Sequence, residues 1–293
     1  MLNIKKYLKK IFFKRKVPCL HYLEVHLVDH CNLNCNACTH FSSISPEKFA
    51  NKNEFEKQVK TLSQKLRFNR IRLLGGEPLL HPDVVDFIEV TKKYFPKSFV
   101  SICTNGILLP SMKKVFWDTC RKYNVVIDIS KYPVIEGKTS FYENLLKENN
   151  INFGGFHDGS DRKLFHNQYG NSDEYVSFEN CAIRKKNIAI LKDGRIFVCP
   201  KTAFVDIYNK HFAQKVPQDK GINIYLSSGN DIKQYLSKPV ETCRYCSYMW
   251  KIVDWKPSEK QMEEWNATND AEEFKKVQQQ FLDMKSKNKK SLF

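Results

Sequence analysis

The sequence has no long apolar run and none of the marks of an exported protein. No stretch approaches the 18 or so apolar residues that span a bilayer, and no N-terminal apolar core is long enough for a signal peptide. Internal repeats and long low-complexity linkers are also lacking. We therefore expect a cytoplasmic protein in a reducing compartment, where the ten cysteines of the 293-residue chain do not form disulfides.

Acidic residues are scarce at both ends of the chain. The net charge is +16, but residues 1–16 contribute seven basic side chains with no acidic one, and residues 285–290 add four lysines. The rest of the chain carries only about +5, too little to predict a nucleic-acid groove. The apolar residues within 1–16 are typical of a basic amphipathic helix. Two interpretations of that helix stay open: peripheral contact with an anionic membrane surface, or packing against the folded domain.

Three cysteines dominate the N-terminal part, in the run Cys31-Asn-Leu-Asn-Cys35-Asn-Ala-Cys38. Three thiolates can hold three irons of a [4Fe–4S] cluster and leave the fourth iron open to a ligand that is not protein. No fourth cysteine lies nearby. The alternative is a zinc site completed by His30 or His40.

Strand-like and helical segments alternate along the first half of the chain. Apolar runs predict strands at 22–28, 70–74, 98–103, 124–129 and 151–156, and helical patterns lie between them at 53–66, 82–94, 111–122 and 138–149. This alternation predicts parallel βαβ units. Strand ends of such units meet at one rim, where we expect Cys31–Cys38, Gly75–Glu77 and Thr104–Gly106 to lie together.

The segment Gly75-Gly76-Glu77-Pro78 follows one of these strands, and with the cysteine run it resembles the radical S-adenosylmethionine (SAM) enzymes. The resemblance implies a partial, six-stranded (β/α) barrel in which these four residues bind the amino group of SAM. It also implies SAM contacts from Thr104 and Asn105 in the Thr-Asn-Gly turn, and from Ser130 by position. That family usually has an aromatic residue where this chain has Ala37, so we expect His40 or Phe41 to contact the adenine.

A second cysteine set occupies the C-terminal part: Cys181, Cys199, Cys243 and Cys246. Between the first two lies a predicted hairpin, residues 187–198 around Asp193-Gly194. The spacing resembles the auxiliary-cluster extension of the SPASM and twitch radical SAM enzymes, and no cysteine follows Cys246, as in the shorter twitch type. The resemblance implies a fully ligated auxiliary [4Fe–4S] cluster. A structural four-cysteine zinc site is the alternative.

Four segments are predicted: a basic N-terminal segment (1–19), the radical SAM partial barrel (20–175), a twitch-like domain of β-hairpin and helix for the auxiliary cluster (176–257), and a C-terminal helix with a basic tail (258–293). The helix is expected over 258–290. Candidates for a catalytic base or substrate contact are side chains on the first strand and at the end of the fifth: Glu24, His26, His157 and Asp158.

The resemblance implies reductive cleavage of SAM to a 5′-deoxyadenosyl radical, with electrons from a flavodoxin- or ferredoxin-type reductant. The auxiliary spacing is most similar to that of aminocyclitol dehydrogenase-type twitch enzymes. We therefore expect hydrogen abstraction from, and oxidation of, a sugar, aminocyclitol or sugar nucleotide. Radical modification of a ribosomally made peptide is the alternative, although only about twenty residues precede the first strand. A non-catalytic zinc or iron–sulfur module that binds nucleic acid is the alternative of another class.

Overall fold

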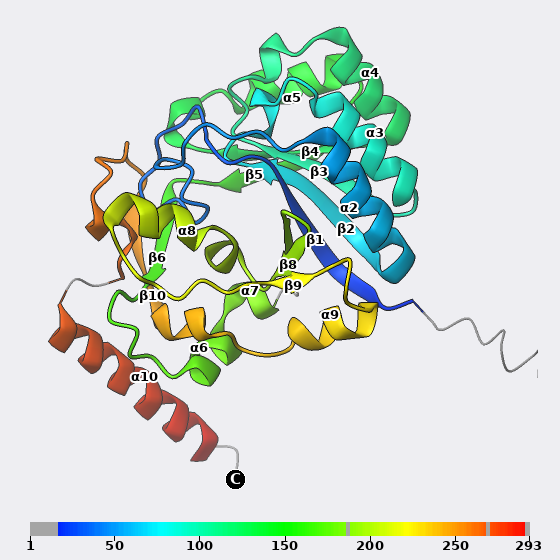
Figure 1. Ribbon diagram of the computed structural model, residues 1–293. Helices are drawn as coiled ribbons and strands as arrows, with labels where there is room; N and C mark the ends of the chain where they lie inside the picture. The colour runs from blue at the N-terminus through cyan, green and yellow to red at the C-terminus, as the bar shows by residue number, and fades with distance from the viewer. Residues whose placement is uncertain (1–16, 186–187, 268–269, 291–293) are drawn as a thin grey trace, which may run out of the picture.

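The computed structural model describes residues 17–185, 188–267 and 270–290, and its centre is one sheet in the order β5-β4-β3-β2-β1-β7-β8-β9 (Figure 1). The strands are β1 (Cys19–Val28), β2 (Arg67–Gly75), β3 (Phe99–Thr104), β4 (Val126–Lys131), β5 (Asn152–Asp158), β7 (Ile188–Lys192), β8 (Arg195–Phe197) and β9 (Ile222–Asn223). Strands β5 to β7 of this order are all parallel. In the described part of the chain, the sheet ends at β5 and β9 and does not close on itself. The prediction of an α/β fold with a partial barrel is confirmed.

Helices cover the outer face of the parallel strands: α2 (Lys52–Lys65), α3 (Val84–Tyr94), α4 (Lys114–Tyr123) and α5 (Thr139–Glu148). Alternation along β1 explains this layer, because Leu23, Val25 and Leu27 are buried in the core that the helices share with the sheet. Asn51 begins α2 by accepting a hydrogen bond from the Glu54 amide at 3.1 Å. The predicted strands and helices of this half are confirmed.

The hairpin predicted around Asp193-Gly194 is also confirmed over the described residues; residue 187 lies outside them. Both turn residues have positive φ, 48° and 72°, as a two-residue hairpin requires. Its first strand, β7, pairs in parallel with β1 through Tyr22–Val25. The hairpin thus supplies the sixth parallel strand of the barrel sheet and extends that sheet on the far side of β1.

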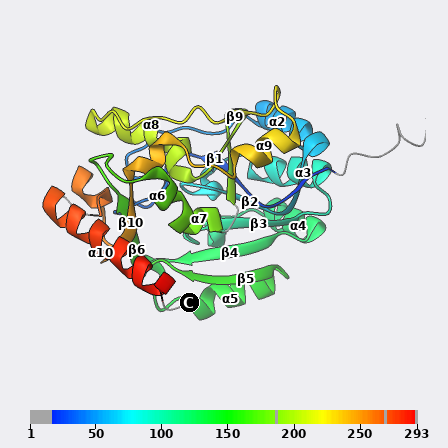
Figure 2. The same cartoon turned by 90° about the horizontal axis from the view of Figure 1, so that it is seen from below.

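The inner face of β1 and β7 is covered by α8 (Pro200–Phe212). Side chains of α8 form a second core with Tyr22, Phe41 and Trp265. A separate antiparallel pair, β6 (Asp161–His166) with β10 (Cys246–Asp254), lies beside the main sheet together with α6 (Glu174–Asn180) and α7 (Ala182–Lys185) (Figure 2). A short α9 (Gly229–Tyr235) precedes β10 along the chain.

The C-terminal helix was predicted over 258–290, and the first part of that prediction is wrong. The helix α10 spans Ala271–Lys290, where Asp270 accepts hydrogen bonds from the amides of Glu272 and Glu273 at 2.8 and 2.9 Å. Earlier in the predicted range, Met262–Trp265 form a short 3₁₀ helix, and Ser258 is hydrogen-bonded to the N-terminal cysteine loop. Phe274 docks α10 on the domain, since 1% of it is exposed, whereas Met284 on the predicted apolar face is 54% exposed.

Two further expectations concern the surface of the chain. Residues 1–16, the predicted basic amphipathic helix, lie outside the described residues, so its membrane contact stays a prediction. In the part of the chain that the structure describes, every helix is too short or too polar to cross a membrane.

Replacing Phe204 with alanine tests the inner core. Phe204 is fully buried, His26 stacks on it at 4.1 Å between ring centroids, and the Lys192 ammonium lies 4.3 Å from its ring centre. We expect Phe204→Ala to lower the free energy of unfolding by about 3–5 kcal/mol, measured by denaturant titration under anaerobic conditions. Tyr175→Ala, at a residue 64% exposed, is the control and should change it by less than about 0.5 kcal/mol. Equal effects of the two substitutions would contradict the packing described.

Candidate functional site

The loop that carries Cys31, Cys35 and Cys38 follows β1 and is held by residues more than 200 positions later. The Asn36 amide donates to the Lys256 carbonyl at 3.1 Å, and the Ser258 amide donates to the Asn34 carbonyl at 2.8 Å. The indole of Trp265 donates to the Cys38 carbonyl at 2.9 Å. This C-terminal clamp, residues 254–265, fixes the path of the loop; the sequence analysis gave these residues no role.

The three thiols of the loop lie close enough to affect one another's ionisation. Burial raises the pKa of Cys31 to about 12, and the Glu77, Cys38 and Cys35 charges add to the increase. Burial raises the pKa of Cys35 as well. For Cys38 burial also acts to raise the pKa, but a hydrogen bond and charge from His40, with the charge of Arg162, bring it to about 6. Thiolates gathered in such a buried place need positive charge, which iron ions supply.

Arg162 on β6 contacts this loop, and the sequence analysis missed it. Its Nε donates to the Asn36 carbonyl at 3.1 Å and its Nη2 to the Ala37 carbonyl at 3.2 Å. Its guanidinium also stacks toward Tyr132, 5.7 Å from the ring centre. A lone arginine in a polar strand gives no sequence signal. Its position next to Cys35 and Cys38 suits an anionic iron–thiolate centre.

The two glycines of the Gly75-Gly76-Glu77-Pro78 segment allow β2 to approach the start of the cysteine loop. A Cβ on Gly76 would lie 2.0 Å from the His30 carbonyl oxygen and 2.9 Å from the Cys31 nitrogen. A Cβ on Gly75, which has φ +153°, would lie 2.2 Å from the Val28 carbonyl oxygen. No side chain fits at either place, so glycine is required here to bring the two rim segments together.

Glu77 is fully buried and joins two of the predicted site segments. Its carboxylate accepts hydrogen bonds from the Thr104 hydroxyl at 2.7 Å, the Asn105 amide at 2.8 Å and the Leu79 amide at 3.1 Å. Burial raises the pKa of Glu77 to about 7, against the lowering effect of these three donors. The structure therefore places the Thr104–Asn105 turn directly on the Glu77 side chain.

Asn105 completes the connection to the cysteine loop. Its Nδ2 donates to the Asn32 Oδ1 at 2.7 Å and lies 3.7 Å from the Cys31 sulfur.

Ser130 lies near the carboxyl end of β4, at the same rim. Of the two residues expected to replace the aromatic at Ala37, Phe41 is 3% exposed and packs on Tyr208.

The second cysteine set is brought together from four separate elements. Cys181 ends α6, Cys199 precedes α8, Cys243 lies in a 3₁₀ turn and Cys246 begins β10. Burial raises the pKa of each of the first three, to about 12 at Cys243, and the neighbouring thiols contribute to each increase. Buried Lys201, which the sequence analysis missed, places its Nζ 3.7 Å from the Cys246 sulfur.

Both cysteine sets supply the soft thiolate donors that iron–sulfur clusters require. Their thiols are buried or half-buried, and each set has a cationic side chain nearby. Within the described ranges, no group of three or more His, Cys, Asp or Glu side chains is arranged around a point for a single metal ion.

The predicted candidates for a catalytic base lie in different surroundings. His26 is buried against Phe204 and His40, and burial lowers its pKa well below the ordinary value. Asp158 accepts hydrogen bonds from the amide and hydroxyl of Ser160 in a turn. Glu24 is buried on the inner face of β1, and His157 lies 3.6 Å from the Asp128 carboxylate.

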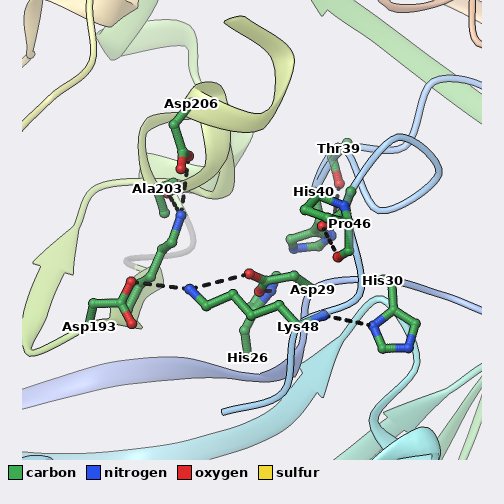
Figure 3. A network of polar contacts seen from close by, with 12 residues as sticks. His26, Asp29, His30, Thr39, His40, Pro46, Lys48, Asp193, Ala203 and Asp206 are labelled. Carbon is green, nitrogen blue, oxygen red and sulfur yellow. Dashed lines mark hydrogen bonds and ion pairs between the residues drawn. The ribbon is translucent and has the colours of Figure 1, made fainter. Parts of the chain in front are cut away.

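A cavity of about 370 Å³ adjoins the rim between α2 and the β7–β8 turn. Lys48 crosses it, with its ammonium 3.6 Å from Asp29 and 3.4 Å from Asp193, while the Lys48 amide donates to the His30 ring at 3.3 Å (Figure 3). Burial raises the pKa of Asp29 despite the neighbouring lysines. This network braces the backbone just before Cys31.

Comparison with known proteins agrees with this geometry. Residues 25–130 match the radical SAM superfamily. The chain is 31% identical to GTP 3′,8-cyclase of Microcystis aeruginosa over 114 residues, 37% of this chain and 35% of that protein. The same cyclase of Clostridium perfringens is 31% identical over 116 residues, 38% of this chain and 36% of that one. The chain thus matches only about a third of the length of these relatives.

One solved structure is similar across most of the molecule. It is BtrN in complex with AdoMet and 2-DOIA, with a TM-score of 0.50 and 18% identity, covering 78% of this chain and 92% of that one. At this identity the likeness shows a shared fold. The segment that matches the radical SAM superfamily, residues 25–130, includes Cys31–Cys38, Gly75–Pro78 and Thr104–Asn105.

Proposed function

We propose that this protein is a radical SAM enzyme that binds SAM at the rim and oxidises a sugar, aminocyclitol or sugar nucleotide. One observation carries the proposal: buried Glu77 holds the Thr104–Asn105 turn, and Asn105 in turn contacts the cysteine loop beside Cys31. Three thiols and a set of SAM-binding candidates are thereby fixed at one rim. The choice of substrate rests on the resemblance in the auxiliary cysteine spacing.

The first site is formed by the N-terminal cysteine loop and the residues around it. Cys31, Cys35 and Cys38 would hold a [4Fe–4S] cluster, which when bound supplies the electron that cleaves SAM to methionine and a 5′-deoxyadenosyl radical. Glu77 would orient the amino group of SAM. Arg162 contributes positive charge beside the thiolates, and the C-terminal clamp keeps the loop in place.

The second cysteine set would hold an auxiliary cluster with four protein ligands. Four thiolates leave no iron for an external ligand, which suits a group that only accepts an electron. The Lys201 ammonium next to Cys246 favours the more negative state that follows reduction. This arrangement supports a net two-electron oxidation of the substrate.

Removing the three N-terminal thiols tests the cluster assignment. Anaerobically purified protein should contain about eight iron and eight sulfide per chain if two [4Fe–4S] clusters are present. The triple variant Cys31→Ala, Cys35→Ala, Cys38→Ala should form no 5′-deoxyadenosine from SAM under dithionite and should keep about half the iron. Cys19→Ala, at an exposed thiol, is the control and should keep both 5′-deoxyadenosine formation and the full iron content. Continued SAM cleavage by the triple variant, or zinc in place of iron, would refute the assignment.

Glu77→Gln tests SAM binding. The substitution removes the negative charge proposed to bind the SAM ammonium, and it can place an amide group against the Asn105 N–H donor. A charge-assisted hydrogen bond is worth about 1.5–3 kcal/mol, so SAM should bind roughly ten- to a hundredfold more weakly in anaerobic calorimetry, with the iron content unchanged. Glu179→Gln on the surface of α6 is the control. Equal SAM affinity in wild type and Glu77→Gln would count against this role.

The auxiliary site is tested by replacing Cys243 and Cys246 with alanine. We expect the loss of about half the iron and of substrate oxidation, because these two residues supply half the ligands of one cluster. Iron and sulfide analysis, with circular dichroism to monitor folding, measures the outcome. A soluble double variant with full iron content would show that these cysteines do not hold a cluster.

A further inference from the structure

A pair of arginines lies on the inner face of the barrel sheet, the face turned away from α2 to α5. Along β2, Ile71 and Leu73 are buried in the core shared with the helices, so Arg70 and Arg72 point to the other face. Asp128 on β4 faces them. We call Arg70, Arg72 and Asp128 the arginine layer; none of its members was a predicted site residue.

Short contacts fix the geometry of the arginine layer. Arg70 Nη2 lies 2.6 Å from Asp128 Oδ2 and 3.3 Å from the Ser101 hydroxyl, and Arg72 Nη2 lies 3.5 Å from the same Asp128 oxygen. Both guanidinium groups also lie over the ring of Tyr22, at 5.9 and 5.8 Å from its centre. Arg70 lies over the Phe99 ring as well, 5.1 Å from its centre. Two cations are therefore held side by side by one carboxylate and by aromatic rings.

Exposure decides which charge a ligand would meet. The Asp128 side chain is 1% exposed, whereas those of Arg70 and Arg72 are 33% and 22% exposed. Glu24, a further carboxylate on this face, is 6% exposed. Although these four charges cancel formally, the carboxylates lie beneath the surface and the guanidinium groups form it.

The arginine layer also retains hydrogen-bond donors. Arg72 Nε also donates to the Cys103 sulfur at 2.5 Å. Each guanidinium carries five N–H groups, so the pair has more donors than the Asp128 carboxylate, the Ser101 hydroxyl and the Cys103 sulfur can accept. Among the described residues, the buried Nε of Arg70 has no hydrogen-bond partner. Planar, bidentate donors of this kind match the oxygens of phosphate and carboxylate groups.

The layer lies directly beneath the proposed SAM site. Asp128 is two residues before Ser130 on β4, and Asp128 pairs in register with Cys103, two residues before Asn105. A strand rises about 3.3 Å per residue, so Asp128, which both guanidinium groups approach, lies roughly 7 Å below the rim on the same face. The backbone of Arg72 and Arg70 lies lower, in register with Ser101 and Phe99. A sugar held at the layer by an anionic group would extend toward the SAM-binding residues.

We propose that Arg70 and Arg72 bind a phosphoryl or carboxylate group of the substrate. The inference rests on the proposed function and narrows it. An anionic sugar, such as a sugar phosphate, sugar nucleotide or sugar acid, fits this surface, whereas a cationic aminocyclitol would meet two guanidinium groups. The layer would then act in substrate specificity and positioning.

Anaerobic calorimetry on the full-length, cluster-loaded protein tests this with four probes of one ring size: glucose 1-phosphate, glucuronate, glucose and glucosamine. We expect glucose 1-phosphate or glucuronate to bind at least about tenfold more tightly than glucose or glucosamine, since a charge-assisted pair is worth about 1.5–3 kcal/mol. The anion that binds more tightly shows whether the arginine layer prefers a phosphoryl or a carboxylate group. Equal binding of all four, or no saturable binding, would overturn the proposal.

Variants assign the binding to the layer. Arg70→Gln and Arg72→Gln should each weaken binding of the preferred anion about tenfold or more. Arg72→Lys should recover part of the lost affinity, because lysine keeps the positive charge without the planar, bidentate donors of a guanidinium group. Arg67→Gln is the matched control, because Arg67 lies on the same strand and its guanidinium donates to the Ser63 and Leu66 carbonyls, away from Asp128. Unchanged affinity in both glutamine variants would refute the assignment.

A second measurement needs no substitution, in case the variants fail to fold. Phenylglyoxal modifies accessible arginines, and mass spectrometry locates the products. The preferred anion should slow modification of Arg70 and Arg72 and leave Arg67 unaffected; equal modification with and without the anion would overturn the proposal. Neither experiment uses SAM or a reductant, so its failure is distinct from failure of the SAM-cleavage prediction.

Discussion

The buried carboxylate of Glu77 is the interaction on which the rim depends. A carboxylate with no exposure is costly unless its oxygens accept hydrogen bonds, and here Thr104, Asn105 and Leu79 supply three. Because Thr104 ends β3 and Asn105 follows it, the carboxylate holds the end of β2 against the end of β3. Gly76 then brings both against the start of the cysteine loop. Any ligand bound at the rim would meet a surface already fixed in place.

The C-terminal clamp gives the cysteine loop its second support. Parallel strands position the ends of a loop but not its middle, and a loop with three buried or half-buried thiols and few regular hydrogen bonds needs partners from elsewhere. Residues 254–265 and Arg162 supply them. The same chain region continues from Cys246, so the two cysteine sets are joined by a short structural path through β10 and β6. This connection supports the proposal that both sets serve one reaction.

The sequence predicted the parts of this structure that have local signals. Apolar runs and helical patterns located the strands and helices of the barrel, and cysteine spacing located both thiol sets. Contacts between distant segments have no such signal: β7 pairs with β1, and Arg162 and Lys201 are single basic residues in unremarkable segments. The helix predicted from residue 258 begins at Ala271, although Asp270 with Glu273 three residues later is a recognisable helix start.

The central claim is that Cys31, Cys35 and Cys38 hold a cluster with one iron open to SAM. Electron paramagnetic resonance of the dithionite-reduced protein, with and without SAM labelled at its amino nitrogen and carboxylate oxygen, tests it most directly. The account predicts that SAM shifts the signal of one of two clusters, that the labels couple to that cluster alone, and that the Cys31, Cys35 and Cys38 variant loses this signal while the other persists. A spectrum that SAM leaves unchanged, or label coupling to the cluster held by Cys181, Cys199, Cys243 and Cys246, would contradict it.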